Sequence, residues 1–169
     1  MKQDSCIKEL ADNARRIRVL VENISVEQAR WKPDPDSWSI LEVVNHLLDE
    51  EKPDFRVRLD ITQRQSGEVW PAINPPVWVE ERRYNDQNPG ESLTGFLSAR
   101  EDSLAWLRTL DSPDWEASYE ASWGSIRAGD LMASWVGHDL LHMRQLIELH
   151  WAYTMNAVRP YNALYAGDW

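Results

Sequence analysis

Two histidines stand four residues apart in the last third of the chain, in the sequence His138-Asp139-Leu140-Leu141-His142. Residues at this spacing are neighbours on a helix, with Cβ atoms about 5–6 Å apart, so two such imidazoles can bind one metal ion. Because each helical residue advances by about 100°, both histidines fall within about 20° of Leu131, in the middle of the apolar stripe. Polar rings there are costly unless something satisfies them. The pair therefore indicates either a metal site or structural hydrogen bonds in the core.

A third histidine, His46, belongs to an earlier helical segment. It falls at about 240° from Ile40 on the helical wheel, at the edge of the apolar arc, so it can lean into the core without being fully buried. One ligand from a facing helix would complete an open three-histidine site of the catalytic kind, with water in the remaining positions. His46, His138 and His142 are therefore the candidate metal ligands. Imidazole suits zinc, nickel, iron and copper alike, so the metal stays open.

The candidate catalytic residues are the carboxylates Asp49 and Glu50, which follow His46 on the same helix. Either could be a further ligand, orient an imidazole N–H or act as a general base. Gln145 falls on the apolar seam and could donate a hydrogen bond to a ligand or a buried carbonyl. Arg144 falls outside the seam, where a salt bridge is expected.

Three other residues of chemical interest have simpler interpretations. His150 lies off the seam of its helix and is expected at an edge or in solvent. Trp38 and Trp135, two of the ten tryptophans, are expected to pack in the core rather than to line a pocket.

Four helices must position these side chains. Apolar residues at steps of three and four predict helices over residues 5–24, 39–64, 92–110 and 128–153. Ser39 and Glu42 have the spacing of a capping box, Pro53 predicts a kink or break near Lys52, and Ser92 is a candidate cap for the third helix. Residues 67–90 are rich in proline and glycine, which indicates a long irregular connection. Residues 111–126 form a second loop and 159–169 an irregular tail.

Alternation with period two is confined to the doubtful segment 77–79. We therefore predict an all-α protein, a four-helix bundle with long crossover connections. The length of 169 residues fits a single domain over residues 1–169.

The net charge of the chain argues against two classes of binding partner. It has 28 acidic and 18 basic residues, which gives a formal charge of −10. This balance argues against binding to nucleic acid and against docking on an anionic membrane.

The single cysteine, Cys6, excludes an internal disulfide. The sequence has no apolar signal region and no run of about 18 apolar residues, so we expect a cytoplasmic protein. It also lacks the common nucleotide-binding, serine-hydrolase and zincin motifs.

Three stretches resemble the DinB/YfiT-like superfamily of proposed metalloenzymes. Residues 31–47 resemble the family's loop into its second helix, with Trp38-Ser39-Ile40 and Asn45-His46-Leu47. Residues 135–146 resemble its H-x-x-x-H-x-R-Q-[IL] motif. The terminal Tyr165-Ala166-Gly167-Asp168-Trp169 is similar to the ending of many members. The family often has a further histidine directly before its last ligand, where this chain has Leu141.

The resemblance implies a four-helix bundle that holds a divalent metal through His46, His138 and His142. It also implies an enzyme with a small-molecule substrate. The first hypothesis for its activity is a transferase that directs a low-molecular-weight thiol, such as bacillithiol or mycothiol, at an electrophile. The second is a hydrolase, with Glu50 or Asp49 as general base. The alternative to both is a non-catalytic bundle whose metal is structural or serves small-ligand binding. A homodimer is plausible from the family, although no sequence feature demands one.

Overall fold

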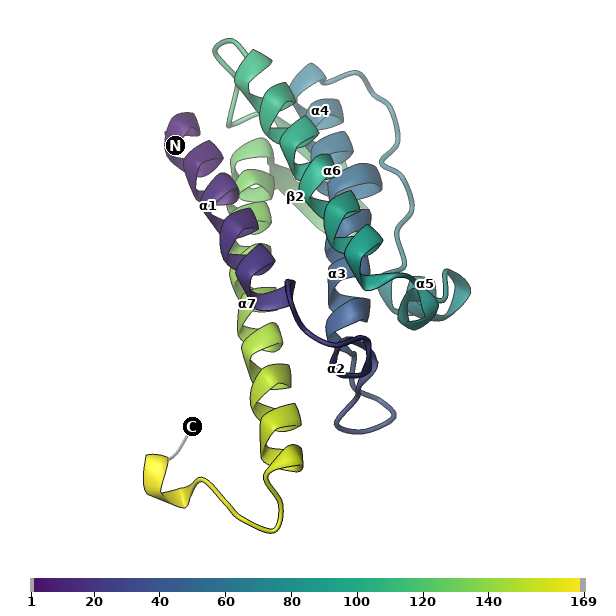
Figure 1. The fold of residues 1–169 in the computed structure, drawn as a ribbon. Coiled ribbons are helices and arrows are strands. Elements are labelled where there is room, and N and C mark those ends of the chain that lie inside the picture. Colours follow the sequence, from purple (N-terminus) through teal and green to yellow (C-terminus); the bar gives the residue numbers. More distant parts are fainter. Residues whose placement is uncertain (1, 168–169) are drawn as a thin grey trace.

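Four long helical segments run side by side through the molecule in the computed structural model, which describes residues 2–167 (Figure 1). They are α1 (Gln3–Val21), the composite segment α3 (Ile40–Asp49) and α4 (Phe55–Arg64), α6 (Pro89–Thr109) and α7 (Ala128–Ala157). Three of the predicted helices thus differ from the structure by a few residues at their ends. The predicted four-helix bundle is confirmed.

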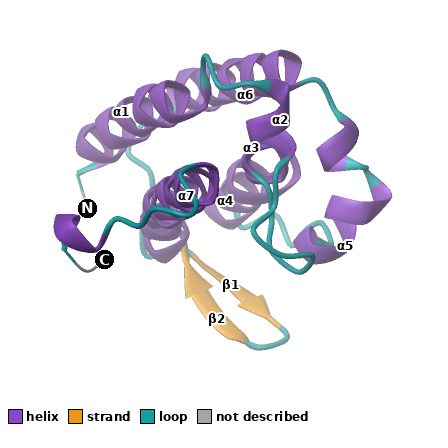
Figure 2. Ribbon diagram, turned by 60° about the horizontal axis from the view of Figure 1, so that its bottom comes forward, coloured by secondary structure: helices purple, strands orange, loops and turns teal. Residues whose placement is uncertain are grey.

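The helices do not pack in chain order. α1 packs against α6 and α7, while the α3–α4 segment packs against the other sides of α6 and α7. Successive long helices such as α1 and α3, or α6 and α7, therefore lie diagonally across the bundle when it is viewed from its end (Figure 2). Helices on a diagonal need connections that cross an end of the bundle, as the segments between α1 and α3 and between α6 and α7 do. The longest connection, 67–90, has another cause: it joins the α3–α4 segment to the adjacent α6 and runs back along the bundle, so that α6 starts at the opposite end (Figure 1).

The composite segment begins and bends where the sequence predicts. Ser39 Oγ accepts a hydrogen bond from the Glu42 N–H at 3.1 Å, and the Glu42 carboxylate accepts one from the Ser39 N–H at 2.7 Å, which completes the capping box. A π-helical turn, η1 (Glu50–Asp54), separates α3 from α4 and contains Pro53. Proline has no N–H to donate to the preceding turn, so the helix widens instead of continuing regularly.

The connection 67–90 is less irregular than predicted. It contains the short helix α5 (Pro75–Glu81) and a 3-10 turn, Tyr84–Asp86. The doubtful strand 77–79 is therefore helical, because Pro75 at the first position of α5 has a backbone already suited to a helix. The next helix starts at Pro89 rather than near Ser92, since Asn88 accepts hydrogen bonds from the N–H groups of Gly90 and Glu91. A short helix, α2 (Val26–Arg30), was also not predicted.

A β-hairpin occupies the predicted loop 111–126 and extends just beyond it. Its strands β1 (Ser118–Ala121) and β2 (Gly124–Arg127) pair antiparallel, and they lie beside α4 and α7 (Figure 2). Gly124 has φ of +142°, a conformation that side chains rarely adopt, and it follows the two-residue turn. Four-residue strands give too little alternation to detect, so the sequence analysis missed the hairpin.

The chain continues past α7 as a tail with one 3-10 turn, Leu164–Ala166. Asp168 and Trp169 of the terminal family motif lie outside the described residues. Within the described part of the chain, no helix combines the length and the apolar character needed to cross a bilayer.

Two apolar clusters fill the bundle. One gathers side chains from the second half of α1, from α3 and from residues 143–149 of α7. The other gathers side chains from the start of α1, from α4, from the end of α6 and from residues 128–135 of α7. Between them lies a layer of buried polar side chains, here called the polar belt: Asn13, His46, Glu50, Glu51, Asp54, Arg100, Ser103 and Asp139. The functional candidates lie in or beside this belt.

Candidate metal centre

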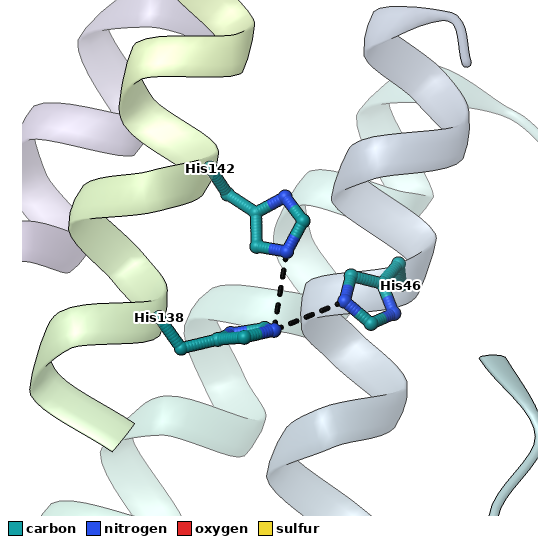
Figure 3. Close-up of side chains that lie close together, drawn as sticks. All are labelled: His46, His138 and His142. Carbon is teal, nitrogen blue, oxygen red and sulfur yellow. Dashed lines mark hydrogen bonds between the residues drawn. The ribbon is translucent and has the colours of Figure 1, made fainter. Parts of the chain in front are cut away.

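The three candidate histidines meet between α3 and α7 (Figure 3). The Nε2 atom of His138 lies 3.1 Å from His46 Nε2 and 3.1 Å from His142 Nε2. Among the described residues, these three form the group of potential metal ligands whose ligand atoms all lie within 4.8 Å of one another. The structure therefore brings together all three histidines that the sequence singled out.

Hydrogen bonds alone do not satisfy this arrangement. An imidazole nitrogen carries either one proton or one lone pair, so His138 Nε2 can make only one good hydrogen bond with its two neighbours. A cation at the centre would accept a lone pair from all three nitrogens at once. Two ligand nitrogens at about 2.0–2.1 Å from a tetrahedral zinc ion lie about 3.3 Å apart. The two separations of 3.1 Å are close to that value, so the donor set fits a metal ion.

Burial keeps the three imidazoles neutral. Burial, followed by the nearby His142, lowers the pKa of His46 to about 3. Burial and the charges of its neighbours lower the pKa of His138 to about 2, and burial also lowers the pKa of His142. Neutral rings have a free lone pair, which is the form that binds a metal. His46 is only 5% exposed, so it is buried in the belt and not at the edge predicted for it.

Groups around the rings hold two of them in place. Gln145 Oε1 lies 2.8 Å from His142 Nδ1 and accepts its hydrogen bond, the reverse of the donation predicted for Gln145. The Trp38 ring lies parallel to His142, with centroids 6.4 Å apart. The Phe55 ring meets His138 edge-on at 5.2 Å. These contacts restrict how the imidazoles can turn.

The two candidate carboxylates have different positions. Asp49 turns away from the histidines and hydrogen-bonds to Arg82 and Tyr84, so it is not placed to serve the site. Glu50 Oε1 lies 3.5 Å from His46 Nδ1, whereas it is His46 Nε2 that faces the other histidines. Glu50 therefore lies behind His46. Burial, together with a hydrogen bond and the charge from Asp54, raises the pKa of Glu50 to about 9.

One side of the histidine cluster opens to a surface hollow. His142 lines this hollow, which has a volume of about 540 Å³, together with Pro33, Asp36, Ser37, Trp38, Gln145, Glu148, Leu149 and Ala152. Trp38 is half-buried: it packs against the first apolar cluster, as predicted, and it also lines the hollow. Trp135 is fully buried, as predicted. The hollow gives a small molecule access to His142.

A buried ion network beside the histidines was missed by the sequence analysis. Arg100 donates two hydrogen bonds to the Asp139 carboxylate, both at 2.8 Å, and one to Glu51 Oε1 at 2.8 Å. It also donates to the Leu10 carbonyl at 2.9 Å, and the Trp135 indole N–H donates to Glu51 Oε1 at 2.9 Å. The signal was present, because Arg100 stands four residues from both Phe96 and Leu104 on the apolar stripe of α6.

The remaining residues of α7 have structural roles. His150 is half-buried, which agrees with the predicted position at an edge: its Nδ1 lies 3.0 Å from Gln28 Nε2, and its Nε2 lies 2.6 Å from the Leu20 carbonyl. Arg144 forms the predicted salt bridge, 3.1 Å from Glu148.

Comparisons with known proteins give the family and the fold of the chain. The sequence matches the DinB superfamily over residues 9–146, a range that includes all three histidines. Among solved structures, YfiT from Bacillus subtilis is described as a probable metal-dependent hydrolase with an unusual four-helix bundle topology. It matches with a TM-score of 0.77 and 19% sequence identity, over 88% of this chain and 85% of YfiT. At this identity the likeness shows a common fold. No curated protein matches the sequence significantly.

Proposed function

Because the chain belongs to the DinB superfamily, as its sequence motifs predicted, we propose that it is an enzyme that depends on a divalent metal and acts on a small-molecule substrate. The observation that carries the proposal is the position of His142, which meets His46 and His138 on one side and the hollow on the other. Three protein ligands leave room in a metal's coordination shell, and the hollow lets a substrate reach it.

The residues of the chain have distinct parts in this proposal. His46, His138 and His142 would hold the metal, and Gln145 keeps the His142 ring turned so that Nε2 points inward. The metal would supply Lewis acidity and lower the pKa of a water molecule or thiol bound to it. The apolar wall of Trp38, Pro33 and Leu149 would cover the body of the substrate and exclude water from it.

Transfer to a low-molecular-weight thiol is the reaction that fits the site best. The metal would favour the thiolate form, so the reaction needs no separate base near the histidines. The geometry supplies no candidate for such a base among Asp49 and Glu50, since one turns away and the other lies behind His46. The thiol proton would pass to solvent, and the sulfur would form a bond to an electrophilic carbon as the bond from that carbon to its leaving group breaks.

Hydrolysis is the second candidate, and the description of YfiT as a probable metal-dependent hydrolase favours it. It requires a group that takes a proton from water. Glu148 lines the hollow together with His142, although it also pairs with Arg144. Parallel assays with thiol-dependent and hydrolytic substrates on the metal-loaded protein would separate the two reactions.

The first experiment is a measurement of metal content per chain by mass spectrometry, on untagged protein purified without chelator. We expect about one equivalent of a transition metal, with zinc, nickel and iron as the candidates. His46→Ala should lose it. His150→Ala is the matched control, because it removes a histidine of α7 that lies outside the cluster, and it should keep the metal.

Two outcomes would contradict the proposal. If the wild-type protein binds no metal even after incubation with Zn²⁺, Ni²⁺ and Fe²⁺, the histidines are hydrogen-bonding residues of the core. If it binds metal but added thiols and small anions leave the spectrum of the Co²⁺-substituted protein unchanged, the coordination shell is closed. The metal is then structural and ties α3 to α7.

A further inference from the structure

Two buried polar atoms behind the histidine cluster lack hydrogen-bond partners. They are His46 Nδ1 and Glu50 Oε1, which lie 3.5 Å apart. Both residues are buried, with exposed fractions of 5% for His46 and 4% for Glu50. A buried polar group without a partner destabilises the fold, so two of them facing each other need an explanation.

The backbone brings these two atoms together. Glu50 follows His46 by four residues, which places both on the same face of the helix. Glu50 is also the first residue of the π-helical turn η1. A wider turn spreads side chains less than the usual 100° apart, which allows the adjacent Glu50 and Glu51 both to be buried.

Glu50 is held from its other side as well. Its carboxyl group hydrogen-bonds to Asp54, and Asp54 forms an ion pair with Arg58 at 2.8 Å. Asp54 is itself only 5% exposed. Glu50 thus lies between His46 and Asp54, on the side of the His46 ring opposite to the Nε2 atom that faces His138.

We propose that Glu50 is a positioning residue of the metal site, whose Oε1 accepts the hydrogen bond of His46 Nδ1 when His46 Nε2 binds the metal. This inference rests on the proposed function. A metal on Nε2 uses that lone pair, which leaves the ring proton on Nδ1. Glu50 Oε1 is the acceptor within reach, and a shift of about 0.5 Å would bring the two atoms to the usual N–H···O distance of about 2.9–3.0 Å. Histidine ligands of metals commonly donate their other N–H to such a carboxylate.

This role differs from those of a fourth ligand and of a general base. Both need the carboxylate on the side of His46 that faces His138. Glu50 lies on the opposite side, so it acts through the His46 ring and touches neither metal nor substrate.

The test compares metal affinity and apo-protein stability in three variants. Glu50→Leu removes the acceptor and should weaken metal binding by about 10–100-fold, measured by competition with a chromophoric chelator. Its apo form should be about as stable as wild type, because the Oε1 atom that is lost has no hydrogen-bond partner and Asp54 keeps its ion pair with Arg58. Glu50→Gln keeps an acceptor oxygen and should bind within a few-fold of wild type. Asp49→Asn is the matched control, since it changes the neighbouring acid that turns away from the site, and its affinity should not change.

A spectroscopic measurement adds a direct view of the hydrogen bond. In the Co²⁺-substituted protein, the ring N–H of His46 should give a hyperfine-shifted proton signal that exchanges slowly with solvent. The signal should broaden or disappear in Glu50→Leu and remain in Glu50→Gln.

The possible failures are distinguishable. Wild-type affinity in Glu50→Leu, with the N–H signal retained, would overturn the role of Glu50 while leaving the metal site intact. A Glu50→Leu protein that loses stability as well as metal, or does not fold, would make Glu50 a structural residue of the belt. Absence of metal from the wild-type protein itself would overturn the proposed function and this inference with it.

Discussion

Two groups of buried polar side chains lie next to each other in the bundle, and they differ in one respect. In the ion network, the charged groups pair with one another. The Arg100 guanidinium donates hydrogen bonds to the carboxylates of Glu51 and Asp139 and to the Leu10 carbonyl. The histidine cluster directs three nitrogens at one point and provides nothing there to bind them. The first group pairs its cation within the chain, although Glu51 Oε2 has no hydrogen-bond partner, whereas the second would need a metal ion to join its three nitrogens.

The two groups are also joined through the backbone. Asp139 follows His138 on α7, and Glu51 follows Glu50 in the π-helical turn. The network contains one guanidinium and two carboxylates, so its formal charge is −1. Burial lowers the pKa of both neighbouring rings; Arg100 lowers that of His138 further, whereas Asp139 opposes the lowering at His142. By bonding to both Glu51 and Asp139, Arg100 helps to hold together the two helical segments that carry the histidines.

The largest effect is expected from removing the central charge of the network. Arg100→Met leaves the Glu51 and Asp139 carboxylates buried beside each other without a cation. Breaking a buried ion network in this way destabilises a protein by about 3–5 kcal/mol. Urea denaturation of the metal-free protein would measure the loss.

The control for this change is Arg144→Met. It makes the same substitution at an arginine whose side chain is 74% exposed and pairs with Glu148. It should change stability by less than about 0.5 kcal/mol. A loss in Arg100→Met that is equally small would show that the network does not hold the belt together, and the contrast with the histidines would fail.

The second effect concerns the metal, and it should appear only in the histidine cluster. A metal at 100 times its dissociation constant should stabilise the wild-type protein by about 2.7 kcal/mol. His142→Leu should abolish this gain while leaving the metal-free protein within about 1 kcal/mol of wild type, because it removes one member of an incomplete group. Denaturation with and without Zn²⁺ gives both numbers. If metal-free His142→Leu lost as much unfolding free energy as Arg100→Met, the histidines would stabilise the fold without a metal, as the ion network does.

The long helices and their order could be predicted because their causes are local. Ser39 with Glu42, and Pro53 inside an apolar repeat, act on the residues beside them, and the structure has the cap and the break that they predict. The hairpin at residues 118–127 could not be predicted in this way, since its strands are stabilised by pairing with each other and by packing on α4 and α7. Likewise, the helix start at Pro89 depends on one cap, Asn88, which competes with the equally plausible Ser92.

In the candidate site, too, some features follow from the local sequence and others depend on distant partners. The spacing of His138 and His142 is a property of one helix, so their shared face follows from the sequence alone. The burial of His46 and the different directions of Asp49 and Glu50 depend on the π-helical turn and on the partners Arg82, Tyr84 and Asp54. These partners lie outside α3, so the position of a residue on the helical wheel of α3 does not predict contacts with them.

The third effect separates the two groups by pH. The pKa of all three histidines lies below the usual 6.5, so on acidification the unfolded chain gains protons that the folded chain does not. Their contribution to stability is therefore complete above pH 6.5 and is lost as the pH falls, by about 1.4 kcal/mol per pH unit for each histidine. His142→Leu should make this slope smaller between pH 6.5 and 5.5 in the metal-free protein, because the pKa of His142 is also lowered by burial.

Other groups of the belt do not mimic this slope. Burial works against the charge of Arg100, but Glu51 and Asp139 outweigh it and hold the pKa of Arg100 above its usual value, so it stays charged. The raised pKa of Glu50, about 9, acts in the opposite direction, because its contribution is complete below pH 4.5 and is lost as the pH rises toward 9. Bound metal should leave with the same acidification, since it competes with protons for the imidazoles. An unchanged metal content at pH 4 would contradict ligation by histidine.

The smallest effect compares two acceptors within the histidine cluster itself. Gln145 accepts from His142 at the edge of the hollow, where water can replace it, whereas Glu50 faces His46 inside the belt, where water has no access. Gln145→Leu should therefore weaken metal binding by only about 2–5-fold, corresponding to about 0.5–1 kcal/mol for one replaceable hydrogen bond. Gln145→Glu retains an acceptor and is the control. If Gln145→Leu weakened binding as much as Glu50→Leu, the hollow would not admit water to His142, and the open side of the site that the proposed reaction requires would be lost with it.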